Sequence, residues 1–191
     1  MSLAEKKMIS FEETKKAVFG EISNSLATVT DEAASAFTEQ LSPGRRVFCD
    51  AAGRSRLQIS GFAMRLAQMG YTAFLVGEPT TTAVCPGDVL IVCSASGNTP
   101  GIVSHALTAK KIGCRILLVT ASPQSELSEI CDAKIILDAA SKNDQSSLTI
   151  QPMGSLFEQS AGLVFDIIVL GLMEKYGIYQ KKMREQHSNL E

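Results

Sequence analysis

Several features that mark common classes of protein are missing from this sequence. It has only two histidines, His105 and His187, without cysteine or carboxylate at metal-ligand spacing, and it has no C-x-x-C pair. We therefore expect no metal centre and no dithiol redox site. Lysine and arginine total 18 against 20 aspartates and glutamates, and the net charge of −2 argues against nucleic acid as the main partner.

Export and membrane signals are also lacking. No charged segment followed by an apolar run opens the chain, so nothing marks it for secretion. The longest apolar run, Ala161 to Met173, is interrupted by Asp166 and is short for a bilayer, so we expect no membrane association but a buried helix that also takes part in an interface. The cysteines are scattered, and we expect reduced core residues of a cytoplasmic protein. They are Cys49, Cys85, Cys93, Cys114 and Cys131.

The order of periodic segments predicts an α/β fold. Residues 10–40 have helical periodicity, with Ser10 as an N-cap, and five strands are expected at 46–50, 71–76, 89–93, 114–120 and 134–137. Helices alternate with these strands, which predicts a doubly wound five-stranded parallel sheet with helices on both faces. We expect one domain over 1–191, with N-terminal helices (1–44), an α/β core and polar, flexible loop (45–152), and a long C-terminal helix and tail (153–191).

The stretch from Val89 to Gly101 organises this arrangement. An apolar β-branched run ends in Ser94-Ala95-Ser96-Gly97-Asn98-Thr99, and Thr99-Pro100 is typical of an N-cap and first helical residue. A helix N-terminus beside hydroxyl groups suits an anion such as a phosphate ester, although an ordinary serine-rich loop is the alternative. The loop carrying Ser55 follows another strand, so both loops should open on one sheet edge.

Other polar residues allow two interpretations each. Glu158, at the start of the long helix, is either a solvated first-turn carboxylate or a half-desolvated general base. Arg54 and Arg56 flank Ser55 and either contact an anion or face solvent. Asp50 ends a strand, and it binds a sugar hydroxyl or caps a turn. For the histidines, a packed or solvated position is the simpler interpretation.

These motifs resemble the sugar isomerase (SIS) domain family, whose signature is a strand followed by Ser-x-Ser-Gly-x-Thr. Further stretches are similar to its 6-phospho-3-hexuloisomerase branch over nearly the whole chain. They are Ala52-Gly53-Arg54-Ser55, Phe62-Ala63-Met64-Arg65-Leu66, Gly70-Tyr71, Gln151-Pro152-Met153-Gly154-Ser155-Leu156-Phe157-Glu158-Gln159 and His187-Ser188-Asn189-Leu190-Glu191. The resemblance implies a flavodoxin-like SIS fold without metal or organic cofactor.

The resemblance also implies an activity and a set of site residues. The reaction is the interconversion of D-arabino-hex-3-ulose 6-phosphate and fructose 6-phosphate, the second step of formaldehyde fixation through the ribulose monophosphate route. A homotetramer built as a dimer of dimers is implied, in which a C-terminal histidine reaches a neighbouring site. The implied residues are Ser55, Ser94, Ser96 and Thr99 for the phosphate, Gly53, Arg54 and Gly97 for other substrate contacts, and Glu158 and His187 for catalysis.

Three departures from the family pattern bear on the substrate. The family often has glycine and glutamate where this chain has Ala95 and Asn98, and glycine where it has Arg56. The phosphate hydroxyls survive these changes, but an isomerase of another phosphosugar stays open. A non-catalytic phosphosugar sensor is the alternative from a different functional class, and it would be favoured if Glu158 lay away from the pocket.

Overall fold

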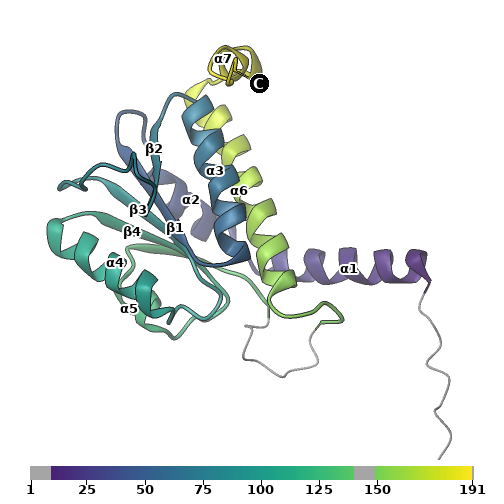
Figure 1. Cartoon of the computed structure of the whole chain (residues 1–191). Helices are drawn as coiled ribbons and strands as arrows, with labels where there is room; N and C mark the ends of the chain where they lie inside the picture. Colours follow the sequence, from purple (N-terminus) through teal and green to yellow (C-terminus); the bar gives the residue numbers. More distant parts are fainter. Residues whose placement is uncertain (1–9, 140–148, 191) are drawn as a thin grey trace, which may run out of the picture.

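A five-stranded parallel sheet forms the centre of the fold in the computed structural model, which describes residues 10–139 and 149–190 (Figure 1). The strand order is β2-β1-β3-β4-β5, and every neighbouring pair is parallel. The predicted doubly wound sheet is therefore confirmed. The strands are β1 (Arg46–Ala51), β2 (Thr72–Leu75), β3 (Val89–Cys93), β4 (Arg115–Thr120) and β5 (Ala133–Ile136).

Helices cover both faces of the sheet, as the alternation of elements predicts. One face packs against α2 (Asp31–Glu39), α3 (Arg54–Gln68) and α6 (Ser155–Tyr176), and the other against α4 (Pro100–Ile112) and α5 (Glu126–Ile130). Along β3, Ile91 and Cys93 belong to the first core cluster whereas Leu90 and Val92 belong to the second. Because both faces are buried, the strand is continuously apolar instead of alternating.

Two further helices lie at the margins of this layered body. α1 (Phe11–Leu26) packs against α6 and extends away from the sheet, and α7 (Gln180–Glu185) lies at the far end of α3 and α6 (Figure 1). Ser10 caps α1, accepting from the Glu13 N–H while the Glu13 side chain accepts from the Ser10 N–H, as its sequence position predicts. The expected C-terminal tail therefore contains a short helix, α7.

The long helix α6 is the main buried helix of the first face. It has 22 residues, and its most apolar 18-residue window has a mean hydropathy of 1.7, so by length and composition it could cross a membrane, but 56% of that window is buried inside the protein. Phe165 stacks on Phe62 of α3 with ring centroids 4.7 Å apart. Ile167 and Leu170 stay exposed, and the expected role of this helix in an interface stays a prediction.

The cysteines only partly follow the prediction that all of them are core residues. Cys49, Cys93 and Cys114 are buried, Cys131 is half-buried, and all five are free thiols. The prediction is wrong for Cys85, which is exposed. This residue lies in the turn before β3, where the apolar run has not yet begun, so no sheet face covers it.

The turn between β3 and α4 requires glycine at position 97. Gly97 has φ of 63°, in the left-handed region, and a Cβ atom there would lie 2.0 Å from the Oγ atom of Ser125. The Gly97 carbonyl accepts a hydrogen bond of 3.1 Å from the Leu127 N–H, which holds the turn against α5. The glycine of the Ser-x-Ser-Gly-x-Thr motif is thus needed for both conformation and close packing.

We predict that Gly97→Ala lowers the free energy of unfolding by roughly 2–4 kcal/mol, because it adds backbone strain and an overlap with Ser125. Urea denaturation followed by circular dichroism measures this change. Gly101→Ala is the matched control, since Gly101 lies in the first turn of α4 with no atom within 4 Å of the added methyl group. Equal stability of the two variants would contradict this explanation of the turn.

Candidate active site

Three helices begin at one pocket beside the carboxyl ends of β1 and β3. Their N-cap residues are Gly53 for α3, Thr99 for α4 and Gly154 for α6, and none of the three makes a side-chain capping hydrogen bond. All three residues line the same cavity. Backbone N–H groups in the first turn of a helix lack partners within the helix, and the helix dipole makes this end positive. The arrangement therefore suits an anion.

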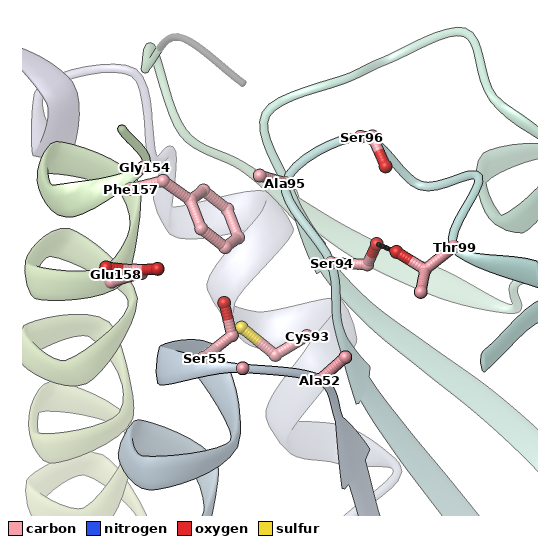
Figure 2. Close-up of a pocket in the computed structure, with 11 residues that line it drawn as sticks. Ala52, Ser55, Cys93, Ser94, Ala95, Ser96, Thr99, Gly154, Phe157 and Glu158 are labelled. Atoms are coloured by element: carbon pink, nitrogen blue, oxygen red, sulfur yellow. Dashed lines mark hydrogen bonds between the residues drawn. The ribbon is translucent and has the colours of Figure 1, made fainter. Parts of the chain in front are cut away.

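The cavity has a volume of about 270 Å³ and combines polar and apolar walls (Figure 2). Pockets for drug-sized ligands span roughly 300–1,000 Å³, so this cavity suits a smaller metabolite. The Phe157 ring forms an apolar wall, and Ser55 and Glu158 lie across the cavity from the loop after β3. The lining residues are Ala52, Gly53, Ser55, Cys93, Ser94, Ala95, Ser96, Thr99, Gly154, Phe157 and Glu158.

The hydroxyl groups of the loop after β3 point to one another and to the cavity. The Oγ atom of Ser94 lies 3.2 Å from the Oγ1 atom of Thr99, while Ser96 Oγ accepts from the Asn98 N–H at 3.3 Å. Thr99 occupies the N-cap position as predicted, but its hydroxyl bonds to Ser94 and not to a backbone N–H of α4. These hydroxyls keep further hydrogen-bonding capacity for a ligand.

Glu158 is a buried carboxylate in the first turn of α6. Only 2% of the residue is exposed, so the interpretation as a solvated carboxylate is wrong, while the role of Glu158 as a general base stays a prediction. The Nη1 atom of Arg54 lies 3.2 Å from Oε2 of Glu158 and also donates to Ser155 Oγ at 3.0 Å. Because an uncompensated buried charge is costly, the neighbouring guanidinium helps to explain how a carboxylate persists at this depth.

Cys93 forms part of the cavity wall beside Ser55 (Figure 2). Burial raises the pKa of the Cys93 thiol to about 12; the nearby charge of Glu158 adds to the rise, and a hydrogen bond with Ser55 opposes it. A thiol with so high a pKa is protonated near neutral pH and is a poor nucleophile. Cys93 thus contributes shape and a neutral contact rather than covalent chemistry.

Some predicted site residues lie outside the cavity lining. Gly97 shapes the turn without lining the cavity, and Arg56 donates to the Val76 carbonyl and to Glu78, each at 2.9 Å. His187 lies near Arg65 and Asp166 at the far end of α3 and α6, in a different pocket of the same chain. Within one chain, the structure therefore brings Glu158 together with Ser55 and the loop after β3, but not with His187.

Two residues that depart from the family pattern form hydrogen bonds with other groups of the protein. The Oδ1 atom of Asn98 accepts from the Glu126 N–H at 2.9 Å, so this side chain joins the loop to the start of α5. The hydrogen bonds of Arg56 direct it towards the end of β2, so within this chain it does not make the anion contact that its place beside Ser55 allowed. Of the three departures, only Ala95 lines the cavity.

Sequence reasoning missed the anchor of the segment that leads into α6. Glu21 of α1 accepts hydrogen bonds from the Thr149 hydroxyl and the Ile150 N–H, each at 2.7 Å, and from the Gln151 side chain at 3.0 Å. The flexible loop expected over 138–152 lies in part outside the described residues, which resume at 149. No local signal pairs residues so far apart in the sequence. Phe157 was also missed, although it adjoins Glu158 in a quoted motif.

Among residues 10–139 and 149–190, no group of three or more histidine, cysteine or acidic side chains could hold a metal ion. The hydroxyls and backbone N–H groups of the cavity are donors for an anion rather than ligands for a transition metal.

Comparison with known proteins places these features in a family. The chain matches the SIS domain over residues 40–161, which is more than half of its length. It is 38% identical over 177 residues to a 3-hexulose-6-phosphate isomerase of Bacillus subtilis (strain 168), covering 91% of this chain and 95% of that one. Its identity to a 3-hexulose-6-phosphate isomerase of Mycobacterium gastri is 40% over 172 residues, with coverages of 90% and 86%.

A solved structure extends the likeness to three dimensions. The crystal structure of a hypothetical protein from Methanococcus jannaschii, which infers a molecular function of 3-hexulose-6-phosphate isomerase, superposes with a TM-score of 0.81 at 26% identity. The match covers 94% of this chain and 99% of that one. The chain therefore belongs to the SIS domain family, alongside relatives named 3-hexulose-6-phosphate isomerase.

Proposed function

We propose that this phosphosugar isomerase interconverts D-arabino-hex-3-ulose 6-phosphate and fructose 6-phosphate. The observation that carries the proposal is the presence, in one small cavity, of a buried carboxylate and three helix N-termini without side-chain caps. The helix starts suit a phosphate, and the carboxylate suits proton transfer at a carbon next to a carbonyl group. The names of the similar relatives support the same substrate.

The phosphate group binds at the helix starts. Ser94, Ser96 and Thr99 supply hydroxyl donors on one side of the cavity, and Ser55 supplies one from the first turn of α3. Gly53 has φ of 60° and ψ of −141°, a conformation that glycine adopts without strain and that lets the backbone come close to the ligand. Gly97 acts indirectly by holding the loop in shape. Neutral hydrogen-bond donors and helix dipoles thus stabilise the negative charge of the phosphate.

Glu158 acts as the base that moves the carbonyl group from C3 to C2. The C2–H bond breaks, its proton goes to the carboxylate, and its electrons form the C2=C3 double bond while negative charge develops on O3. The O2 proton then passes to O3 and Glu158 returns a proton to C3, which completes fructose 6-phosphate. One correctly placed carboxylate is sufficient for both proton transfers.

Arg54 is the residue of this chain that we assign to the developing oxyanion. Its guanidinium lies 3.2 Å from Glu158, which lines the cavity, and 55% of the Arg54 side chain is exposed, although Arg54 itself is not among the lining residues. A donor held beside the reacting atoms stabilises charge that forms in the transition state more than charge in the ground state. Arg54 therefore both compensates Glu158 and faces the substrate oxygen.

Two alternatives are less well supported. A phosphosugar sensor does not need a base in its pocket, whereas Glu158 lines the cavity and is buried there. An isomerase of another phosphosugar was suggested by Asn98 and Arg56, but both side chains are engaged with protein groups away from the cavity. The substitutions that raised the question therefore give little reason to choose a different sugar.

We further propose a cytoplasmic homotetramer, a dimer of dimers, that serves formaldehyde fixation through the ribulose monophosphate route. Apolar side chains of α1, α3 and α6 support self-association, because Phe19, Leu57 and Leu170 are each more than 60% exposed. In such an assembly His187 contributes to the site of a neighbouring subunit, since within its own chain it lies in a different pocket from Glu158.

Replacing Glu158 with Gln should reduce kcat by roughly two to four orders of magnitude, because the amide cannot accept the C2 proton. Fructose 6-phosphate should bind with unchanged or higher affinity, which isothermal titration calorimetry measures. Glu174→Gln, at the exposed far end of the same helix, is the matched control and should retain full turnover. Unchanged turnover in Glu158→Gln would contradict the assignment of Glu158 as the base.

Thr99→Val should raise KM for the sugar phosphate by about ten- to a hundredfold, because it replaces a hydroxyl donor to a charged group with a methyl group of the same shape. The value of kcat should change much less, since the reacting carbons lie at the other end of the substrate. Steady-state kinetics give both constants. Thr108→Val, on the exposed side of α4, should leave both unchanged; equal KM values for the two variants would contradict the phosphate assignment.

Mixed assemblies test whether His187 acts in a neighbouring subunit. We expect His187→Asn and Glu158→Gln to be impaired when each is purified alone. Tetramers assembled from both variants during co-expression should regain about a quarter of the sites, because a site then combines Glu158 of one chain with His187 of another. No regained activity, or a monomer in analytical ultracentrifugation, would contradict the shared site.

A further inference from the structure

A buried carboxylate at the end of β1 is hydrogen-bonded to the flank of α4. Asp50 is 3% exposed, and its Oδ2 atom lies 2.8 Å from the Nδ1 atom of His105, whose side chain is 53% exposed. Across residues 10–139 and 149–190, this is the one side-chain hydrogen bond that joins β1 to α4. Neither residue lines the cavity, and the proposed reaction does not use them.

The Asp50–His105 pair lies close in sequence to both loops that line the cavity, the loop after β1 and the loop after β3. Asp50 comes shortly before Ala52 and Gly53, which line the cavity, and His105 follows Thr99 on the helix that Thr99 begins. The pairing of β1 with β3 ends at Ala51 and Cys93. Beyond these residues, the segment after β1 and the segment after β3 lead to helices on opposite faces of the sheet. α4 itself packs against β3, β4 and α5. The Asp50–His105 bond thus bridges the base of the gap between the loops.

The charges around Asp50 explain why the partner matters. Burial raises the pKa of Asp50, while the hydrogen bond from His105 and the charge of Arg56 act in the opposite direction. The guanidinium of Arg56 is itself bonded to the Val76 carbonyl and to Glu78, so His105 is the direct side-chain partner of the carboxylate, beside the backbone of Ala51. Loss of the imidazole would remove the side-chain donor of a buried acceptor, a situation that favours local rearrangement.

We propose that the Asp50–His105 pair positions the start of α4 relative to the loop after β1, so that both loops contact one phosphate group. A helix and a strand share no ladder of backbone hydrogen bonds, so the side-chain bond fixes the lateral position of α4 relative to β1. Its function is to keep the hydroxyls of Ser94 and Thr99 close enough to the Gly53 backbone for both to contact one anion. This inference rests on the proposed function in that the anion is the phosphate of a sugar phosphate.

The experiment compares His105→Ala, His105→Gln and His105→Asn. The Asn amide nitrogen occupies nearly the position of the histidine Nδ1 atom and can still donate to Asp50, whereas the Gln amide lies further along the side chain. We expect Ala and Gln to weaken the binding of inorganic phosphate and of fructose 6-phosphate about tenfold, and Asn to restore most of it. KM should rise in parallel while kcat changes less than about twofold, because Glu158 and Arg54 are untouched.

A matched control separates positioning from general stability. Arg115→Gln removes the 3.1 Å ion pair with Asp132 at the opposite edge of the sheet, where β4 begins. It should lower the free energy of unfolding without changing phosphate affinity. The Asn and Gln variants are similar polar substitutions, so their difference decides the question even if the Ala variant does not fold.

The possible outcomes distinguish this inference from the proposed function. Equal phosphate affinity in the wild-type protein, His105→Gln and His105→Asn would overturn the positioning role, even with a fully active enzyme. A weaker phosphate complex in His105→Gln than in His105→Asn would support it. Failure of the wild-type protein to convert hex-3-ulose 6-phosphate would overturn the proposed reaction, while the phosphate titrations would still decide the role of the pair.

Discussion

The backbone N–H groups at the start of three helices without side-chain caps are the feature on which the site depends. Because the strand order places β1 beside β3 while α3 and α4 leave to opposite faces, a gap opens at their carboxyl ends. α6 returns from the far end of the chain and adds a third helix start. Side-chain caps would compete with a ligand for these donors, and Gly53, Thr99 and Gly154 form none.

Within this cavity, the residues that bind the substrate differ from the residue that transfers the proton. Hydroxyl groups and helix dipoles hold an anion at one side, whereas Glu158 lies in an apolar setting with Phe157 beside it and Arg54 as its charge partner. Burial makes a carboxylate costly unless a cation compensates it, and the Arg54 contact meets that condition. In the proposed reaction, the phosphate group fixes the position of the substrate, and the C2 and C3 atoms reach the base.

Local sequence signals predicted much of the fold. The apolar run of β3 and the Thr99-Pro100 start of α4 each depend on neighbouring residues, and each was placed correctly. The burial of Glu158 could not be predicted, because a first-turn glutamate has the same pattern whether it faces solvent or a core. The Asp50–His105 bond and the partners of Arg56 depend on tertiary contacts that residue spacing does not encode.

The most direct test of this account uses the unmodified protein and D-arabino-hex-3-ulose 6-phosphate, with the reaction followed by phosphorus and carbon nuclear magnetic resonance. The account predicts that fructose 6-phosphate appears without any added metal or cofactor and that the reverse reaction reaches the same equilibrium mixture. Tight binding of both sugar phosphates without interconversion would contradict it, because the cavity would then hold a phosphosugar while Glu158 moved no proton.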